Sequence, residues 1–261
     1  MKKLETHINQ ITESAVSAFA RTYNVLDYSH NYKKILASLL PENDFSNYSK
    51  LQLHSTINHI LTNRFKGESG LKAKLVSMFV EKDVTAAFEI KVNNSRVDFL
   101  TVNGDTKSYE IKSGIDNLNK LAKQVSDYEK VFEFNYIVID EKHLKGAIEL
   151  IPQHFGIFIM EKEKLVQKKK AERNCCLEPE MQLQLFTKKE LQQQFKNVEP
   201  NVAEIAKQFS ATEINESFKM MLKKRYEKRW QFLKQNMDEI LPIDYQYFFQ
   251  HNIQPKVIYG A

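Results

Sequence analysis

The sequence predicts a mixed α/β protein, with a mixed central sheet flanked by helices and helical extensions at both ends. Three observations support this prediction. Between residues 85 and 112, three segments alternate apolar and polar residues, and the turn signals Asn93-Asn94 and Asn103-Gly104-Asp105 separate them. The following segment, 116–133, repeats its apolar residues at helical spacing. The run FNYIVID at 134–140 is continuously apolar, which is typical of a strand buried on both faces.

The turns predict which charged side chains of the three strands lie together. If the first turn is a two-residue loop, Glu89 lies opposite Asp98. If the second is a three-residue loop with glycine at positive φ, Asp98 lies opposite Glu110. Because side chains alternate between faces, these acids and Lys112 share one face. Opposed carboxylates repel unless a cation lies between them, so this pattern indicates a divalent-cation site. A two-residue second loop would instead put Glu110 on the other face.

The other face of these strands is apolar, and we expect the helix that follows the third strand to cover it. Its members are Phe88, Ile90, Val97, Phe99, Tyr109 and Ile111.

Two short motifs resemble those of a known superfamily. Asp98 followed by Glu110-Ile111-Lys112 resembles the PD-(D/E)XK nuclease signature, with Val97 where proline often stands. Gln124 and Tyr128, on the following helix, resemble the Gln-x-x-x-Tyr element of the RecB-like branch.

The wider pattern is similar to a group of small bacterial PD-(D/E)XK proteins. It comprises EIKS, then Asp116, Lys120-Leu121, the YIVID strand and IPQHFGI. That group usually has arginine at the Lys120 position and tryptophan near His154-Phe155. The resemblance covers about residues 68–160.

The resemblance implies a restriction-endonuclease-like core of helix, three strands, helix and strand, and a set of roles. Asp98 and Glu110, with the Ile111 carbonyl, would bind Mg²⁺ or Mn²⁺, and Lys112 would orient the attacking water. The other implied roles are metal or water binding by Glu89, metal binding by Glu68 in the first helix, and contacts to the phosphodiester from Gln124, Lys120 and Tyr128.

A purely structural interpretation also accounts for these residues. Glu-x-Lys is common by chance and occurs again at Glu89-Ile90-Lys91, although no acid precedes that copy at hairpin distance. Glu68 in a first helical turn also suits the helix dipole without any metal. Tyr128 fits the apolar stripe of its helix, and Gln124 and Lys120 fit a solvated flank.

Composition sets broader limits. The chain has 261 residues and a net charge of +5, which permits a polyanionic partner without requiring one. The sequence lacks a membrane-length apolar run and a signal peptide, so we expect a cytoplasmic protein with no membrane partner. The two cysteines, Cys175 and Cys176, are adjacent, which argues against a structural disulfide, a zinc site or a four-cysteine iron–sulfur cluster.

Four regions are expected: a helical N-terminal extension at 1–66, the nuclease-like core at 67–160, a charged linker or arm at 161–186, and a helical region at 187–261. Helices are expected at 5–23, 32–40, 51–65, 188–196, 201–209 and 212–241. One face of the last helix is predicted to be basic and to contact nucleic acid, although charge runs are often merely solvated. Its cations are Lys219, Lys223, Lys224, Lys228, Arg229 and Lys234, against Glu227.

The expected function is therefore a Mg²⁺-dependent nuclease that hydrolyses DNA in a phage, mobile-element or defence context. One alternative is a catalytically silent protein with the same fold that binds DNA or a protein partner. Another is a structural protein whose carboxylates are ordinary surface groups. RNA as the substrate stays open, and so does a homodimer or a protein partner bound through the helical extensions.

Overall fold

The structure is a computed structural model and describes every residue except 1, 162–163, 197 and 261. Its contacts divide the chain into two compact units, formed by residues 1–73 with 231–261, and by residues 74–230. Both boundaries fall inside helices, namely α5 (Glu68–Phe79) and α11 (Ala211–Gln235). Each unit is therefore described by itself.

The first unit is helical. The predicted helix at 5–23 is two helices, because Thr12 begins a new one: its side chain accepts from the Ala15 N–H at 3.3 Å. A core of apolar side chains from the first four helices, including Phe19, Leu36 and Ile57, holds the unit together. Apart from the ends of α5 and α11, its elements are α1 (Lys2–Gln10), α2 (Glu13–Thr22), α3 (Ser29–Leu39), α4 (Lys50–Arg64), η2 (Pro242–Asp244), α12 (Tyr245–His251) and α13 (Pro255–Tyr259).

A buried polar cluster connects the two chain segments of this unit. The Tyr23 hydroxyl lies 2.9 Å from Asp244 Oδ1 and 3.2 Å from His54 Nδ1, and the Tyr259 hydroxyl donates to Asp244 Oδ2 at 2.9 Å. Burial raises the pKa of Asp244 to about 6 and lowers the pKa of His54 to about 4. Both groups therefore tend towards their neutral forms in the folded state.

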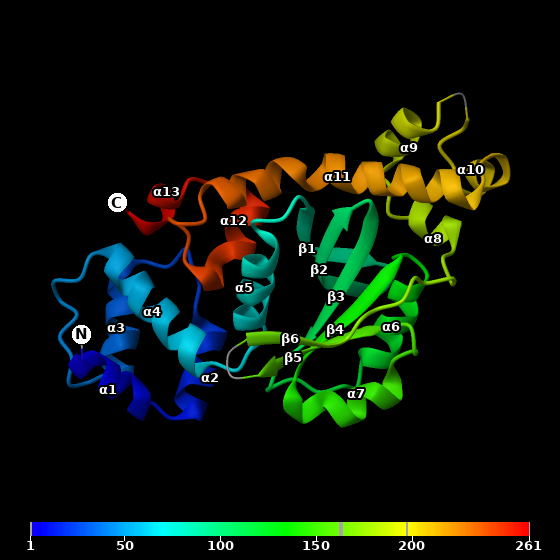
Figure 1. The fold of residues 1–261 in the computed structure, drawn as a ribbon. Helices are drawn as coiled ribbons and strands as arrows, with labels where there is room; N and C mark the ends of the chain where they lie inside the picture. The colour runs from blue at the N-terminus through cyan, green and yellow to red at the C-terminus, as the bar shows by residue number, and fades with distance from the viewer. Residues whose placement is uncertain (1, 162–163, 197, 261) are drawn as a thin grey trace. The chain divides into compact units, whose positions relative to one another are not determined.

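The second unit is built on a six-stranded sheet in which the strands follow sequence order (Figure 1). The first three strands are antiparallel, β3, β4 and β5 are parallel, and β6 returns antiparallel. The strands are β1 (Thr85–Val92), β2 (Ser95–Asn103), β3 (Asp105–Lys112), β4 (Phe134–Asp140), β5 (Gly156–Glu161) and β6 (Lys164–Lys169). This architecture confirms the predicted mixed α/β fold.

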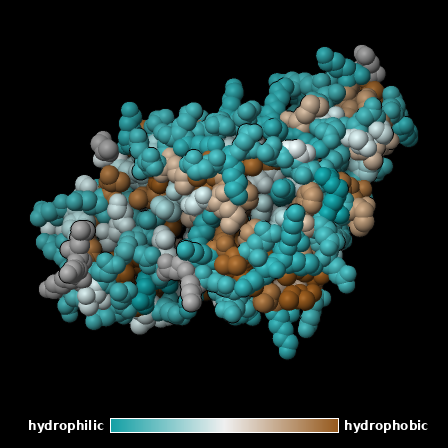
Figure 2. Space-filling view, in the orientation of Figure 1, coloured by the Kyte–Doolittle hydropathy of each residue, from teal (hydrophilic) through white to brown (hydrophobic). Residues whose placement is uncertain are grey.

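Helices connect and follow the strands of this unit. The crossover between β3 and β4 is α6 (Leu121–Glu129), which is shorter than the predicted segment 116–133. The remaining elements are η1 (Glu141–His143), α7 (Leu144–Leu150), α8 (Pro179–Leu183), α9 (Lys188–Gln194), α10 (Val202–Gln208) and most of α11. Hydrophobic surface lies over α7 in Figure 2. Ile148 and Leu150 of α7 are 53% and 39% exposed.

The register agrees with the prediction. Val92 pairs with Ser95 across the first turn, and Val102 pairs with Thr106 across the second. Gly104 has φ +70° at the second turn, a conformation that a residue with a β-carbon adopts at a cost. The acids therefore have the predicted order along neighbouring strands.

The covering of the sheet corrects one expectation, because α6 does not cover the apolar face. Leu121 and Val125 of α6 pack with Ile137 of β4 and Ile157 of β5, on the carboxylate side. The apolar face is instead contacted by other aromatic side chains of the unit: Phe79 lies 6.0 Å from Phe99 and 5.4 Å from Tyr109, and Trp230 lies 6.3 Å from Phe99 (ring centroids).

Part of the segment expected to be a linker is regular structure. Lys164–Lys169 forms β6 at the edge of the sheet, where charged side chains are tolerated because one side of the strand faces solvent. Further along, the backbone N–H groups of Asn174 and Glu178 donate to the carbonyl oxygens of Glu133 and Lys130 at 2.8 Å. These parts of the segment are therefore hydrogen-bonded to the edge of the sheet and to the turn between α6 and β4, instead of forming a mobile arm.

Candidate metal centre

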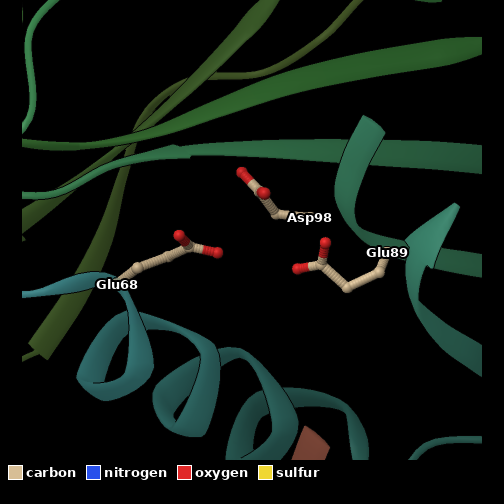
Figure 3. A group of neighbouring side chains, drawn as sticks. All are labelled: Glu68, Glu89 and Asp98. Carbon is tan, nitrogen blue, oxygen red and sulfur yellow. The ribbon is translucent and has the colours of Figure 1, made fainter. Parts of the chain in front are cut away.

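Two carboxylates converge on the β1–β2 hairpin. The ladder pairs Phe88 with Phe99 and Ile90 with Val97, which leaves Glu89 and Asp98 opposite each other between these pairs. One oxygen of Glu89 and one of Asp98 lie within 4.8 Å of each other, and Figure 3 shows the two groups pointing towards a common space. The predicted opposition of these acids is therefore present.

Figure 3 also labels Glu68, which the sequence predicts as a further metal ligand and which belongs to the first unit. It lies in the first turn of α5, a single helix that continues into the second unit. Glu68 Oε1 is 2.5 Å from Lys72 Nζ, one helical turn further on. Metal binding by Glu68 stays a prediction.

The backbone of Glu89 adopts an unusual conformation. Its φ is +58°, in the left-handed region, although the residue lies in the middle of a strand and has a β-carbon. Only Asn93 and Asn252 share this property among the other non-glycine residues that the structure describes. Such strain is concentrated at functional sites, where the surrounding structure imposes it.

Asp98 is oriented by the neighbouring strand. Its Oδ2 accepts a hydrogen bond from the Ile111 backbone N–H at 2.6 Å. Asp98 is half-buried, whereas the apolar side chains that flank it, Val97 and Phe99, are fully buried. The hydrogen bond fixes the carboxylate against β3 and keeps it beside Glu89.

Glu110 forms a separate buried cluster. It is 1% exposed, and its Oε1 lies 2.5 Å from both Lys112 Nζ and Gln124 Nε2. The Tyr128 hydroxyl lies 2.7 Å from Glu110 Oε2 and 2.7 Å from the Arg96 carbonyl oxygen. Burial, followed by the charge of Glu110, raises the pKa of Tyr128, so this hydroxyl remains a donor at neutral pH.

This cluster bears on Glu110 as a predicted metal ligand. Among the described residues of the second unit, oxygens of Glu89 and Asp98 lie within 4.8 Å of each other, and Glu110 is not part of this group. The reason is that α6 covers β3 on this side and brings Gln124 and Tyr128 onto Glu110. Metal binding by Glu110 and by the Ile111 carbonyl stays a prediction.

Gln124 and Lys120, which the sequence predicts to contact the phosphodiester, have different surroundings. Gln124 contacts Glu110 through its amide nitrogen, while its Oε1 is buried with no hydrogen-bond partner among the described residues. Lys120 precedes the first residue of α6 and is exposed. The predicted contacts of Gln124 and Lys120 to a phosphodiester stay predictions.

The cations of α11 do not form one face. Lys219 turns inwards, where its Nζ donates to the Gly104 carbonyl oxygen at 2.8 Å and lies 3.6 Å from buried Glu133. Lys224 and Lys228, four residues apart, share an exposed side of the helix, and Figure 2 shows hydrophilic surface over its middle. Lys223 and Arg229, also exposed, project in other directions. The cations are therefore more dispersed than the sequence pattern indicates.

Arg96 is a residue of the site that sequence reasoning missed. Its Nη1 lies 3.3 Å from Glu89 Oε2, and its side chain is 65% exposed. In the predicted register Arg96 is the diagonal neighbour of Glu89, two residues before Asp98 on the same face. That register was the signal that could have identified it.

The fold and the site together define a mixed α/β protein with acidic side chains gathered on one face of its antiparallel strands. The family model described as bacteriophage P4 protein cII matches residues 62–248, and the chain belongs to this family. No curated protein matches the chain. Among the described residues, no helix combines the length and hydrophobicity that crossing a lipid bilayer requires.

One solved structure is similar in part. It is the SPO1766 protein of unknown function from Silicibacter pomeroyi, with 18% identity and a TM-score of 0.33. The match covers 43% of this chain and 73% of that one. A similarity this low carries no argument about function.

Proposed function

We propose that this protein is a Mg²⁺-dependent nuclease that hydrolyses phosphodiester bonds in DNA. The observation that carries the proposal is the convergence of Glu89 and Asp98 on one side of the β1–β2 hairpin, with oxygens within 4.8 Å. Glu110-Ile111-Lys112 on β3 and Gln124 on α6 lie next to these acids in register and contacts.

The donor set suits a hard divalent cation. Carboxylate oxygens are the ligands that Mg²⁺ prefers, and two opposed carboxylates repel each other in the absence of a counter-charge. Asp98 and Glu89 would hold the ion. When bound, such an ion polarises a phosphate and lowers the pKa of bound water.

The remaining residues would act on the substrate. Lys112 is 9% exposed and is kept beside Glu110 by the 2.5 Å ion pair, so its ammonium charge is held in place before DNA binds. This charge would offset the negative charge that develops on the phosphate. Gln124, fixed by Glu110, would position the phosphodiester, and exposed Lys224 and Lys228 would contact the DNA backbone.

The test is a plasmid-nicking assay with Mg²⁺ or Mn²⁺, with labelled RNA in parallel. Wild-type protein should nick DNA, and EDTA should stop the reaction. Asp98→Asn should reduce the rate at least about 100-fold, because it removes a charged ligand. Glu81→Gln, at an exposed acid in a turn, is the matched control and should keep full activity. Equal rates for Asp98→Asn and wild type would identify a contaminating nuclease and overturn the proposal.

A second candidate is a silent nuclease-fold protein that binds DNA. It is favoured by the engagement of Glu110 with Lys112, Gln124 and Tyr128, which occupies both carboxylate oxygens. Calorimetry separates the two candidates, because the silent protein would show salt-dependent DNA binding without Mn²⁺ binding. The phage context of either candidate is supported by the family, which is described by a bacteriophage P4 protein.

A further inference from the structure

We propose that Arg96 is a positioning residue with two successive partners: the Glu89 carboxylate in the metal-free protein, and a phosphate of DNA once a cation binds Glu89. This inference rests on the proposed function, because it assigns a role at the same site. It goes beyond the sequence motifs, since none of them includes Arg96.

Arg96 lies at the edge of the acidic site. It lies two residues before Asp98 on β2, so both side chains project from the same face. Its Nη1 is 3.3 Å from Glu89 Oε2, yet 65% of its side chain is exposed, against 17% for Glu89. The guanidinium therefore covers Glu89 from the solvent side.

The backbone beneath this side chain is fixed. Arg96 pairs with Lys91 in the β1–β2 ladder, and its carbonyl oxygen lies 2.7 Å from the Tyr128 hydroxyl. The same hydroxyl lies 2.7 Å from Glu110. Exchange of partners by Arg96 thus needs a movement of the side chain only.

The ion pair is weak enough to be exchanged. An exposed ion pair changes an equilibrium constant by at most about fivefold, and the Arg96 side of this pair is 65% exposed. A divalent cation at Glu89 would replace the single positive charge of Arg96, and the released guanidinium would lie beside the ion. Its planar, five-donor group suits two oxygens of a phosphate, which a lysine ammonium does not reproduce.

This exchange predicts that removal of Arg96 changes the affinity for a divalent cation and the affinity for DNA in opposite directions. Removal of Arg96 takes away a positive charge that competes for Glu89, so the affinity for a divalent cation should rise. Removal also takes away a phosphate contact, so the affinity for DNA should fall. A residue with a merely structural role would weaken both interactions or neither.

The experiment measures the two affinities separately in the full-length chain. Mn²⁺ binding is followed by calorimetry without DNA, and DNA binding is followed by anisotropy in Ca²⁺. Arg96→Gln should bind Mn²⁺ about two- to fivefold more tightly, and should lose about tenfold in DNA affinity, with a salt slope lower by about one. Arg96→Lys should keep wild-type Mn²⁺ affinity and show intermediate DNA affinity.

Lys91→Gln is the matched control, because it removes the same charge from the residue paired with Arg96. Its two affinities should change by less than twofold. Wild-type protein that binds Mn²⁺, together with an Arg96→Gln variant whose Mn²⁺ or DNA affinity is unchanged, overturns this inference alone. Wild-type protein that binds no Mn²⁺ overturns the proposed function and the inference together.

Discussion

The left-handed backbone of Glu89 predicts an inverted order of stability between two variants. At an ordinary strand position, a variant with alanine has a free energy of unfolding roughly 0.5–1 kcal/mol higher than a variant with glycine, because glycine loses more conformational entropy on folding. At φ +58°, a residue with a β-carbon instead pays roughly 1–2 kcal/mol. The second effect is larger, so Glu89→Gly should be more stable than Glu89→Ala by on the order of 1 kcal/mol.

Both variants delete the carboxylate, so loss of its repulsion with Asp98 and of its ion pair with Arg96 cancels in the comparison. Urea unfolding followed by circular dichroism measures the difference. The same pair of substitutions at exposed Lys91, two residues further along β1 and without positive φ, is the control and should show the ordinary order. Alanine more stable than glycine at both positions would refute the strain at Glu89.

Three further predictions concern stability. Tyr128→Phe should lower the free energy of unfolding by about 2 kcal/mol in denaturant melts, because buried Glu110 loses a donor; an unchanged value would contradict this role. Gly104→Ala should cost about 1 kcal/mol, because φ is +70° there, and Gly104→Asn should cost less. The pKa of Asp244 is raised to about 6 in the folded state, against 3.8 in the unfolded state, so this group stabilises the fold at low pH and the stabilisation is lost as the pH rises through that window. The pKa of His54 is lowered to about 4, so this group instead destabilises the fold as the pH falls. In the wild type, the two contributions to the pH dependence of the free energy of unfolding nearly cancel. The free energy of unfolding of Asp244→Asn should therefore fall by about 3 kcal/mol between pH 6.5 and pH 4, and a value that does not change with pH would contradict this account.

Local patterns were sufficient to predict the β1–β2–β3 register. The lengths of the two turns and the alternation of side chains put Glu89 opposite Asp98 and placed Glu110 on the carboxylate side. Both signals lie within a few residues of the strands they connect, so they act without knowledge of the rest of the chain. The glycine at the second turn was identified for the same reason.

The strand β6 shows where such patterns fail. Its sequence, KLVQKK, is dominated by charge, and charge normally indicates a loop or a solvated segment. The strand forms because the edge of the sheet beside β5 offers unpaired backbone groups. These unpaired groups exist only once the sheet has formed, and the sequence of the segment does not indicate them.

The sequence by itself determined the elements, their order and the alternation that gathers acids on one side of three strands, because turn residues and periodicity are local properties. Only the tertiary structure decided which helix covers that side. There α6 brings Gln124 and Tyr128 onto Glu110 and leaves Glu89 and Asp98 to converge nearby. Lys219, which the sequence places on the basic face of α11, likewise lies beside buried Glu133. Such choices depend on packing between residues far apart in the chain, and no local pattern encodes them.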